Sequence, residues 1–103
     1  MSDTQVTNNV ERSRFEIHTE DGRLAGFAEY VARDGAREFT HTVVRDEFEG
    51  QGIGGKLARA VLDETRAEGL KVIATCPFIK GWIGKHPAYA DLVHAPRAST
   101  ATD

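Results

Sequence analysis

The segment from Glu49 to Lys56 (EGQGIGGK) carries the clearest chemical signal in the sequence, because it holds four glycines just ahead of a predicted helix. Small residues at a helix start allow several backbone N–H groups to converge on a phosphate, and the helix dipole favours negative charge there. We therefore predict a phosphate-binding loop made by Glu49, Gly50, Gln51, Gly52, Ile53, Gly54, Gly55 and Lys56.

Two familiar phosphate-binding patterns overlap in this loop, and neither fits its surroundings. Gly50, Gly52 and Gly55 match a dinucleotide fingerprint, but that fold opens with this βαβ unit and carries an acidic residue after the next strand. Gly50, Gly55 and Lys56 match a P-loop, except that Leu57 stands where the motif needs a hydroxyl to bind Mg²⁺. Two alternatives remain: a loop that binds phosphate groups through another pattern, and a glycine-rich turn that binds nothing.

Two further residues have side chains suited to group or proton transfer. Cys76 follows a short β-branched segment and precedes Pro77, and a helix start there would favour the thiolate form. The alternative for Cys76 is a small buried hydrophobic residue. His41 alternates with Phe39 and Val43, so it is either a hydrogen-bonded core histidine or a proton acceptor for an amine or for Cys76.

Three aromatic residues lie near the C-terminus, at positions 78, 82 and 89. Tyr89 is either a proton donor or a packing aromatic. Phe78 and Trp82 are expected to form the apolar face of the last helix, together with Ile79.

The first half of the chain predicts three antiparallel strands, at 15–19, 24–32 and 37–44. Asp-Gly pairs separate these alternating segments, and such pairs suit tight hairpin turns, which need a positive φ. In the third strand, the strict alternation predicts that Phe39, His41 and Val43 share one face.

The second half predicts a helix, a strand and a second helix. Apolar residues from 54 to 68 recur at helical spacing, and the short β-branched segment 70–76 predicts a strand. A right-handed crossover would make that strand parallel to the third one. Pro77 suits the first turn of a helix that would end near Lys85, and residues 88–93 are ambiguous.

The predicted fold class is therefore α/β, with a three-strand antiparallel meander, a βαβ crossover and a C-terminal helix. Residues 13–94 are expected to form one domain, between loose tails at 1–12 and 95–103, because both ends lack periodicity.

The composition excludes several classes of protein. The chain has 103 residues, one cysteine, a net charge of −3 and no block of Lys and Arg. One cysteine cannot form an internal disulfide, and the charge argues against binding nucleic acid or an anionic membrane. The polar N-terminus carries no secretory signal. We expect a cytoplasmic monomer or weak homodimer without a metal.

Several segments together resemble the GNAT superfamily of N-acetyltransferases. The coenzyme A loop of that superfamily has the pattern Arg/Gln-x-x-Gly-x-Gly/Ala between a strand and a helix, and Gly52 and Gly54 occupy the glycine positions here. More narrowly, the chain over about 14–93 resembles very short proteins of the N-acetyltransferase domain-containing 1 type, through residues 38–44 (EFTHTVV), the glycine loop, Thr75-Cys76-Pro77 and His86-Pro87-x-Tyr89.

This resemblance implies that acetyl-CoA is a co-substrate and that a primary amine, on a small molecule or a protein, accepts the acetyl group. It implies that Val43 and Val44 offer backbone groups to the pantetheine arm. It also marks Cys76 as facing the acetyl group and includes His41, so we expect Cys76 and His41 to be the catalytic residues.

One position departs from the family pattern. Glu49 stands where the pattern has Arg or Gln, and a carboxylate close to a diphosphate is unfavourable unless it points away. The loop backbone and Lys56 would then hold the diphosphate. The alternative function is a module that binds CoA or acetyl-CoA with little or no catalysis.

Overall fold

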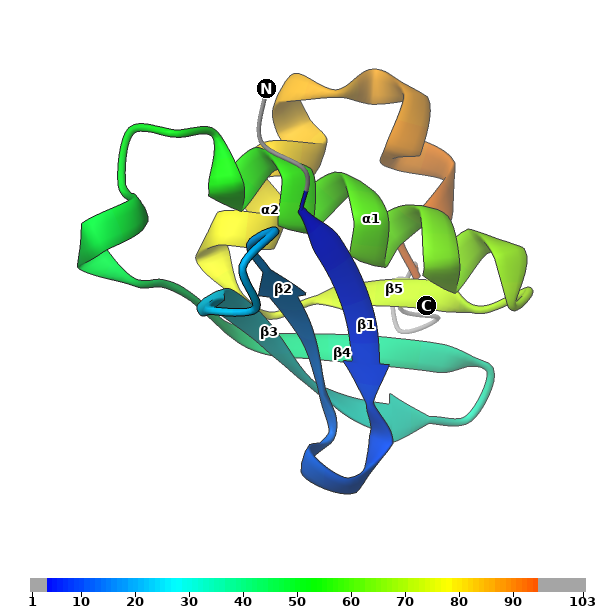
Figure 1. Cartoon of the computed structure of the whole chain (residues 1–103). Helices are drawn as coiled ribbons and strands as arrows, with labels where there is room; N and C mark the ends of the chain where they lie inside the picture. The colour runs from blue at the N-terminus through cyan, green and yellow to red at the C-terminus, as the bar shows by residue number, and fades with distance from the viewer. Residues whose placement is uncertain (1–3, 95–103) are drawn as a thin grey trace, which may run out of the picture.

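Five strands form one mixed sheet in the computed structural model, which describes residues 4–94 (Figure 1). The strands are ordered β1-β2-β3-β4-β5; β1 to β4 are antiparallel, and β5 is parallel to β4. The elements are β1 Gln5–Asn9, η1 Val10–Arg12, β2 Arg14–His18, β3 Leu24–Arg33, β4 Ala36–Val44, η2 Asp46–Phe48, α1 Ile53–Ala67, β5 Lys71–Ala74, α2 Pro77–Lys85 and η3 Pro87–Leu92. This confirms the predicted α/β architecture.

The expectation of a loose tail over residues 1–12 is wrong for the part that the structure describes. Gln5–Asn9 extends the meander to four strands by pairing with β2. Val6 lies opposite Ile17 and packs against the core, while Asn8 accepts a hydrogen bond from the Tyr30 hydroxyl at 2.6 Å. Asn8, a polar residue, thus takes a position on the core side. The sequence of β1 therefore lacks the alternation of apolar and polar residues that would predict a strand. The predicted tail at 95–103 lies outside the described residues.

The core lies between the sheet and the helices, which cover one of its faces (Figure 1). The predicted apolar face of α1 is confirmed: Leu57, Ala58, Val61 and Leu62 are fully buried. They pack in one cluster with the inward side chains of β2, β3 and β4, and these include Phe15, Ile17, Ala28 and Phe39.

A bulge in β4 changes which side chains share a face. Glu29 of β3 pairs with His41, and the next residue, Tyr30, pairs with Phe39, so Thr40 is an extra residue in β4. Phe39 is therefore fully buried under α1, whereas His41 is exposed on the opposite face. The prediction that Phe39 and His41 share a face is wrong, because the bulge interrupts the two-residue period between them.

The C-terminal part follows the prediction closely. α2 begins at Pro77 and ends at Lys85, and it contributes Ile79 and Ile83 to the core. The ambiguous segment forms η3, after which Val93 makes an isolated bridge to Val72. No helix within residues 4–94 is long and apolar enough to cross a membrane.

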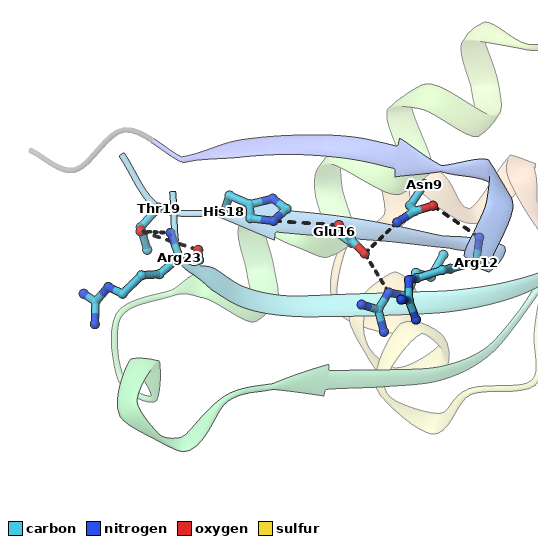
Figure 2. A network of polar contacts seen from close by, with 7 residues as sticks. Asn9, Arg12, Glu16, His18, Thr19 and Arg23 are labelled. Atoms are coloured by element: carbon cyan, nitrogen blue, oxygen red, sulfur yellow. Dashed lines mark hydrogen bonds and ion pairs between the residues drawn. The ribbon is translucent and has the colours of Figure 1, made fainter. Parts of the chain in front are cut away.

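The other face of the sheet is polar, and no helix covers it within the described residues (Figure 1). Figure 2 shows Glu16 on this face, where its carboxylate accepts hydrogen bonds from Asn9 Nδ2 at 3.1 Å and Arg14 Nε at 2.8 Å. Partial burial acts to raise the pKa of Glu16, but these hydrogen bonds outweigh it, so the pKa lies below its ordinary value. An antiparallel sheet with one solvated face is expected to show this pattern; we call this surface the open face.

Candidate functional site

The glycine loop forms a concave backbone turn at the start of α1. Gly50 and Gly52 have φ values of 81° and 75°, which favour glycine, and nothing would lie within 4 Å of a Cβ at either position. The first helical hydrogen bond runs from the Lys56 amide to the Gly52 carbonyl at 3.1 Å. The earlier N–H groups of α1 have no partner within the helix, and Gly52 supplies no side-chain cap. The loop therefore offers open space beside unsatisfied donors.

The side chains of the loop differ in their surroundings. Ile53 is buried and anchors the start of α1 in the core, whereas Glu49, Gln51 and Lys56 are exposed. Glu49 follows η2, whose Asp46 and Glu47 are also acidic. Arg45 precedes these acids and Arg23 pairs with Glu47 at 3.3 Å, so Glu49 is the acid of the loop itself and Lys56 is its cation.

β4 and β5 separate beside this loop. Phe39 and Ala74 are the last paired residues, and one further hydrogen bond runs from the Cys76 amide to the Phe39 carbonyl at 2.8 Å. β4 continues over residues 40–44 past the end of β5 at Ala74, and no other strand within residues 4–94 pairs with it on that side. We call the place where residues 40–44 diverge from residues 75–76 the wedge.

The two valines at the end of β4 do not offer their backbones to the same side. The Val43 carbonyl faces β3 so closely that a Cβ on Gly26 would lie 2.6 Å from it. Successive strand residues direct their N–H and C=O groups to opposite sides. The backbone groups of Val44 and Thr42 therefore face the wedge, whereas those of Val43 bond to β3.

Cys76 lies in the wedge, next to a residue that the sequence interpretation did not select. It is 3% exposed, it precedes Pro77 at the start of α2, and its Sγ lies 3.3 Å from Thr42 Oγ1. The bulge at Thr40 is responsible, because it turns Thr42 rather than His41 toward the helices.

His41 lies on the open face, so the structure does not bring it together with Cys76. Its cross-strand partner is Glu29, and Glu38 lies on the same face. Hydrogen bonds from Thr75 and then from Arg33 lower the pKa of Glu38 below its ordinary value. The open side of the wedge thus carries the imidazole of His41 and the carboxylates of Glu29 and Glu38.

Phe78 lies between the loop and the wedge instead of in the core. Its side chain is 40% exposed, and a Cβ on Gly54 would lie 2.9 Å from the end of its ring and 3.6 Å from Val44. The ends of β4, α1 and α2 meet here. The sequence did not indicate this position, because Phe78 lies one helical turn before Trp82, and that spacing predicts a residue on the buried face of the helix.

Tyr89 has a structural role rather than a role in the wedge. Its hydroxyl donates to Asp63 Oδ1 of α1 at 2.7 Å and accepts from Arg59 at 3.3 Å, and its ring lies 5.2 Å from that of Trp82. The hydrogen bond to Asp63 raises the pKa of Tyr89 above its ordinary value. A phenol committed to Asp63 is a poor proton donor to a thiolate.

The comparison with known proteins agrees with this geometry. A family model described as GCN5-related N-acetyl-transferase matches residues 14–92, and the chain belongs to this family. It is 32% identical to Protein NATD1 of Gallus gallus over 92 aligned residues, and this alignment covers 87% of this chain and 83% of that protein. Protein NATD1 of Xenopus tropicalis is 31% identical over 88 residues, covering 84% and 80%.

A solved structure has the same fold. The solution structure of a GCN5-like putative N-acetyltransferase from Staphylococcus aureus matches with a TM-score of 0.68 and 28% identity, over 96% of each chain. The family and the fold predicted from the sequence are therefore confirmed, and family membership supports binding of an acyl-CoA.

Proposed function

We propose that the protein binds acetyl-CoA and transfers the acetyl group to a primary amine. The observation that carries this proposal is the continuity of the glycine loop with the wedge: a cradle of backbone donors leads directly to unpaired strand groups and then to Cys76. This order matches the parts of coenzyme A, in which a diphosphate is followed by an amide-bearing arm and a thioester.

The residues of the chain fit this ligand. The open cradle at Gly50 and Gly52 has room for a diphosphate, with the N–H groups of the first turn of α1 and Lys56 as its partners. The backbone groups of Thr42 and Val44 would hold the pantetheine amides. Bound acetyl-CoA would supply a thioester carbonyl, the electrophile in acyl transfer.

The open face is where we place the amine. His41 there would accept the proton that the amine loses as its nitrogen bonds to the thioester carbonyl carbon. The C–S bond would then break, and CoA would leave as the thiolate and take up that proton. The wedge would hold the two reactants in contact. Cys76 lines the helix side of the wedge. We favour direct transfer to the amine over a covalent intermediate on Cys76.

Acetyl-CoA should raise the melting temperature of the protein in the absence of Mg²⁺. At one hundred times its dissociation constant, the ligand adds about 2.7 kcal/mol, which corresponds to roughly 10–20 °C for a domain of this size. Differential scanning fluorimetry with ATP and NAD as matched nucleotide controls should show little change. A flat response to acetyl-CoA, combined with a response to Mg-ATP, would overturn the proposal.

A CoA-binding module without catalysis is the second candidate, and Glu49 favours it. Its carboxylate stands where the family pattern has Arg or Gln, and a carboxylate beside a diphosphate is unfavourable, so the loop lacks a polar side chain that the family pattern has. A screen of small amines, lysine peptides and protein N-termini for release of free CoA thiol separates the two functions.

Direct transfer predicts how two variants differ. Cys76→Ala should keep most of the turnover, whereas His41→Ala should lose about a hundredfold, a typical contribution of a general base. Intact-mass spectrometry of wild type with acetyl-CoA and no acceptor should show unmodified protein. An acetyl adduct that disappears in Cys76→Ala together with turnover would instead establish the covalent route.

A further inference from the structure

β1 forms one edge of the sheet, and no strand within residues 4–94 pairs with its outer side (Figure 1). The Val43 carbonyl faces β3, and alternation across the paired strands extends this assignment to β1. Thr7 thus bonds to Glu16 of β2, whereas Val6 and Asn8 direct their backbone groups outward. Each of these two residues presents one unpaired donor and one unpaired acceptor along this edge.

The two edges of the sheet differ in how they are protected. Natural sheets blunt an exposed edge with charged residues, proline, a very short strand or a covering segment. β5, the other edge, has four residues, begins with Lys71 and is met at Val72 by an isolated bridge from Val93. The segment 4–10 (TQVTNNV) has no charge and no proline, and it ends at Val10, which is 71% exposed. The β1 edge is therefore suited to pairing with a further strand.

We propose that a second copy of this chain pairs with the β1 edge, with the two β1 strands antiparallel about a two-fold axis at Thr7. In this register Val6 lies opposite Asn8 of the other copy, so their outward groups bond to each other, and Gln5 lies opposite Asn9. The two Thr7 side chains lie side by side on the open face. The strand thus pairs along its length with itself, as an isologous interface requires.

The groove between β1 and α1 is complementary in charge to a second copy of itself. Lys56 lines it near the start of β1 and Glu64 near the end of β1, with the small Ala60 between them. Arg59 and Asp63 also border the groove, but both are bonded to η3. A two-fold axis would bring the basic end of one groove beside the acidic end of the other, twice in the same interface. This is why we assign the edge to a second copy and not to a foreign strand.

This inference goes beyond the proposed acyl-transfer site, and its test needs no ligand. Sedimentation velocity of the full chain should show a concentration-dependent equilibrium between monomer and dimer. Thr7→Lys should weaken dimerisation about tenfold, because two like charges would lie directly opposite each other at the axis. Within one copy the new lysine faces Glu16, so the fold should be kept. Thr40→Lys, the same change on β4, should leave the equilibrium unchanged.

A disulfide measures the register. In Thr7→Cys, the two thiols would lie at a pair that is not hydrogen-bonded, with Cα atoms about 4.5 Å apart, so mild oxidation should cross-link the dimer. In Gln5→Cys, the two cysteines would lie about 13 Å apart along the strands and should not cross-link. Cys76 is 3% exposed, so wild type should run as a monomer on a non-reducing denaturing gel.

Several results would overturn the proposal. A monomer at every concentration up to roughly 1 mM would do so, as would a dimer that Thr7→Lys leaves intact. Equal cross-linking of Gln5→Cys and Thr7→Cys would reject the register. If circular dichroism shows that Thr7→Lys does not fold, the two cysteine variants test the same contact. Acetyl-CoA binding is measured separately, so a monomer that binds acetyl-CoA rejects this inference and leaves the proposed function standing.

Discussion

Gly54→Glu should weaken acetyl-CoA binding at least about a hundredfold, measured by isothermal titration calorimetry, while leaving the protein folded. The new carboxylate would lie in the first turn of α1, beside the N–H groups that we assign to the diphosphate, and placing like charges together costs several kcal/mol. The fold should tolerate the change for two reasons. A negative charge suits a helix N-terminus, and the crowding falls on the end of the half-exposed Phe78 ring, which can move.

Two controls isolate the charge from the added bulk. Gly84→Glu makes the same substitution at an exposed position of α2 where nothing lies within 4 Å of a Cβ, and it should bind like wild type. Gly54→Ala adds only the Cβ that displaces Phe78, so it measures the steric part of the effect. Normal binding by Gly54→Glu would mean that the diphosphate lies elsewhere.

The second large effect is on stability: Arg37→Met should lower the free energy of unfolding by roughly 2–3 kcal/mol, or about 10–20 °C in melting temperature. Arg37 is 6% exposed, donates to Thr65 Oγ1 at 3.0 Å and to Glu68 at 2.9 Å, and lies over the rings of Phe15 and Tyr30. It therefore ties β4 to α1 through polar and aromatic contacts that methionine cannot replace.

The pH dependence of this variant gives a second measurement. The hydrogen bond from Arg37 holds the pKa of Glu68 below its ordinary value of 4.5. A lowered pKa in the folded protein adds stability above the ordinary value, and that stability is lost as the pH falls through the lowered one. The difference between wild type and Arg37→Met in chemical denaturation should therefore narrow under acid. Arg66→Met, which breaks an exposed pair with Asp91, should have a much smaller effect at any pH. Equal stability of wild type and Arg37→Met would contradict the interpretation.

Much of the fold could be predicted because local signals agreed with the tertiary structure. Gly22 and Gly35 both have the positive φ that their Asp-Gly turns require, and the apolar period of α1 matches its buried face. β1 could not be predicted, since its core-side position 8 is an asparagine whose partner, Tyr30, is distant in sequence.

The candidate site was predicted less completely. The glycine loop and Cys76 are local signals, because a helix must begin after each of them. Thr42 was missed because a bulge depends on how neighbouring strands pair, and the sequence of β4 alternates without a break. Tertiary pairing also explains why His41 lies on the open face.

The parallel seam between β4 and β5 has a consequence for folding order. The meander of β1 to β4 joins neighbours in sequence, whereas β5 reaches β4 only after the whole of α1 and pairs with it over Ala36–Phe39. Pairing two segments that are distant in sequence requires a larger loss of chain entropy than pairing neighbours. A short strand pairing also opens more easily, so its backbone amides are less protected from hydrogen exchange. β5 and α2 are thus expected to dock last and to open first. The wedge lies at this junction, so a ligand that contacts both the loop and β4 would bind beside the segment expected to open first, and its binding would favour the docked state of β5 and α2.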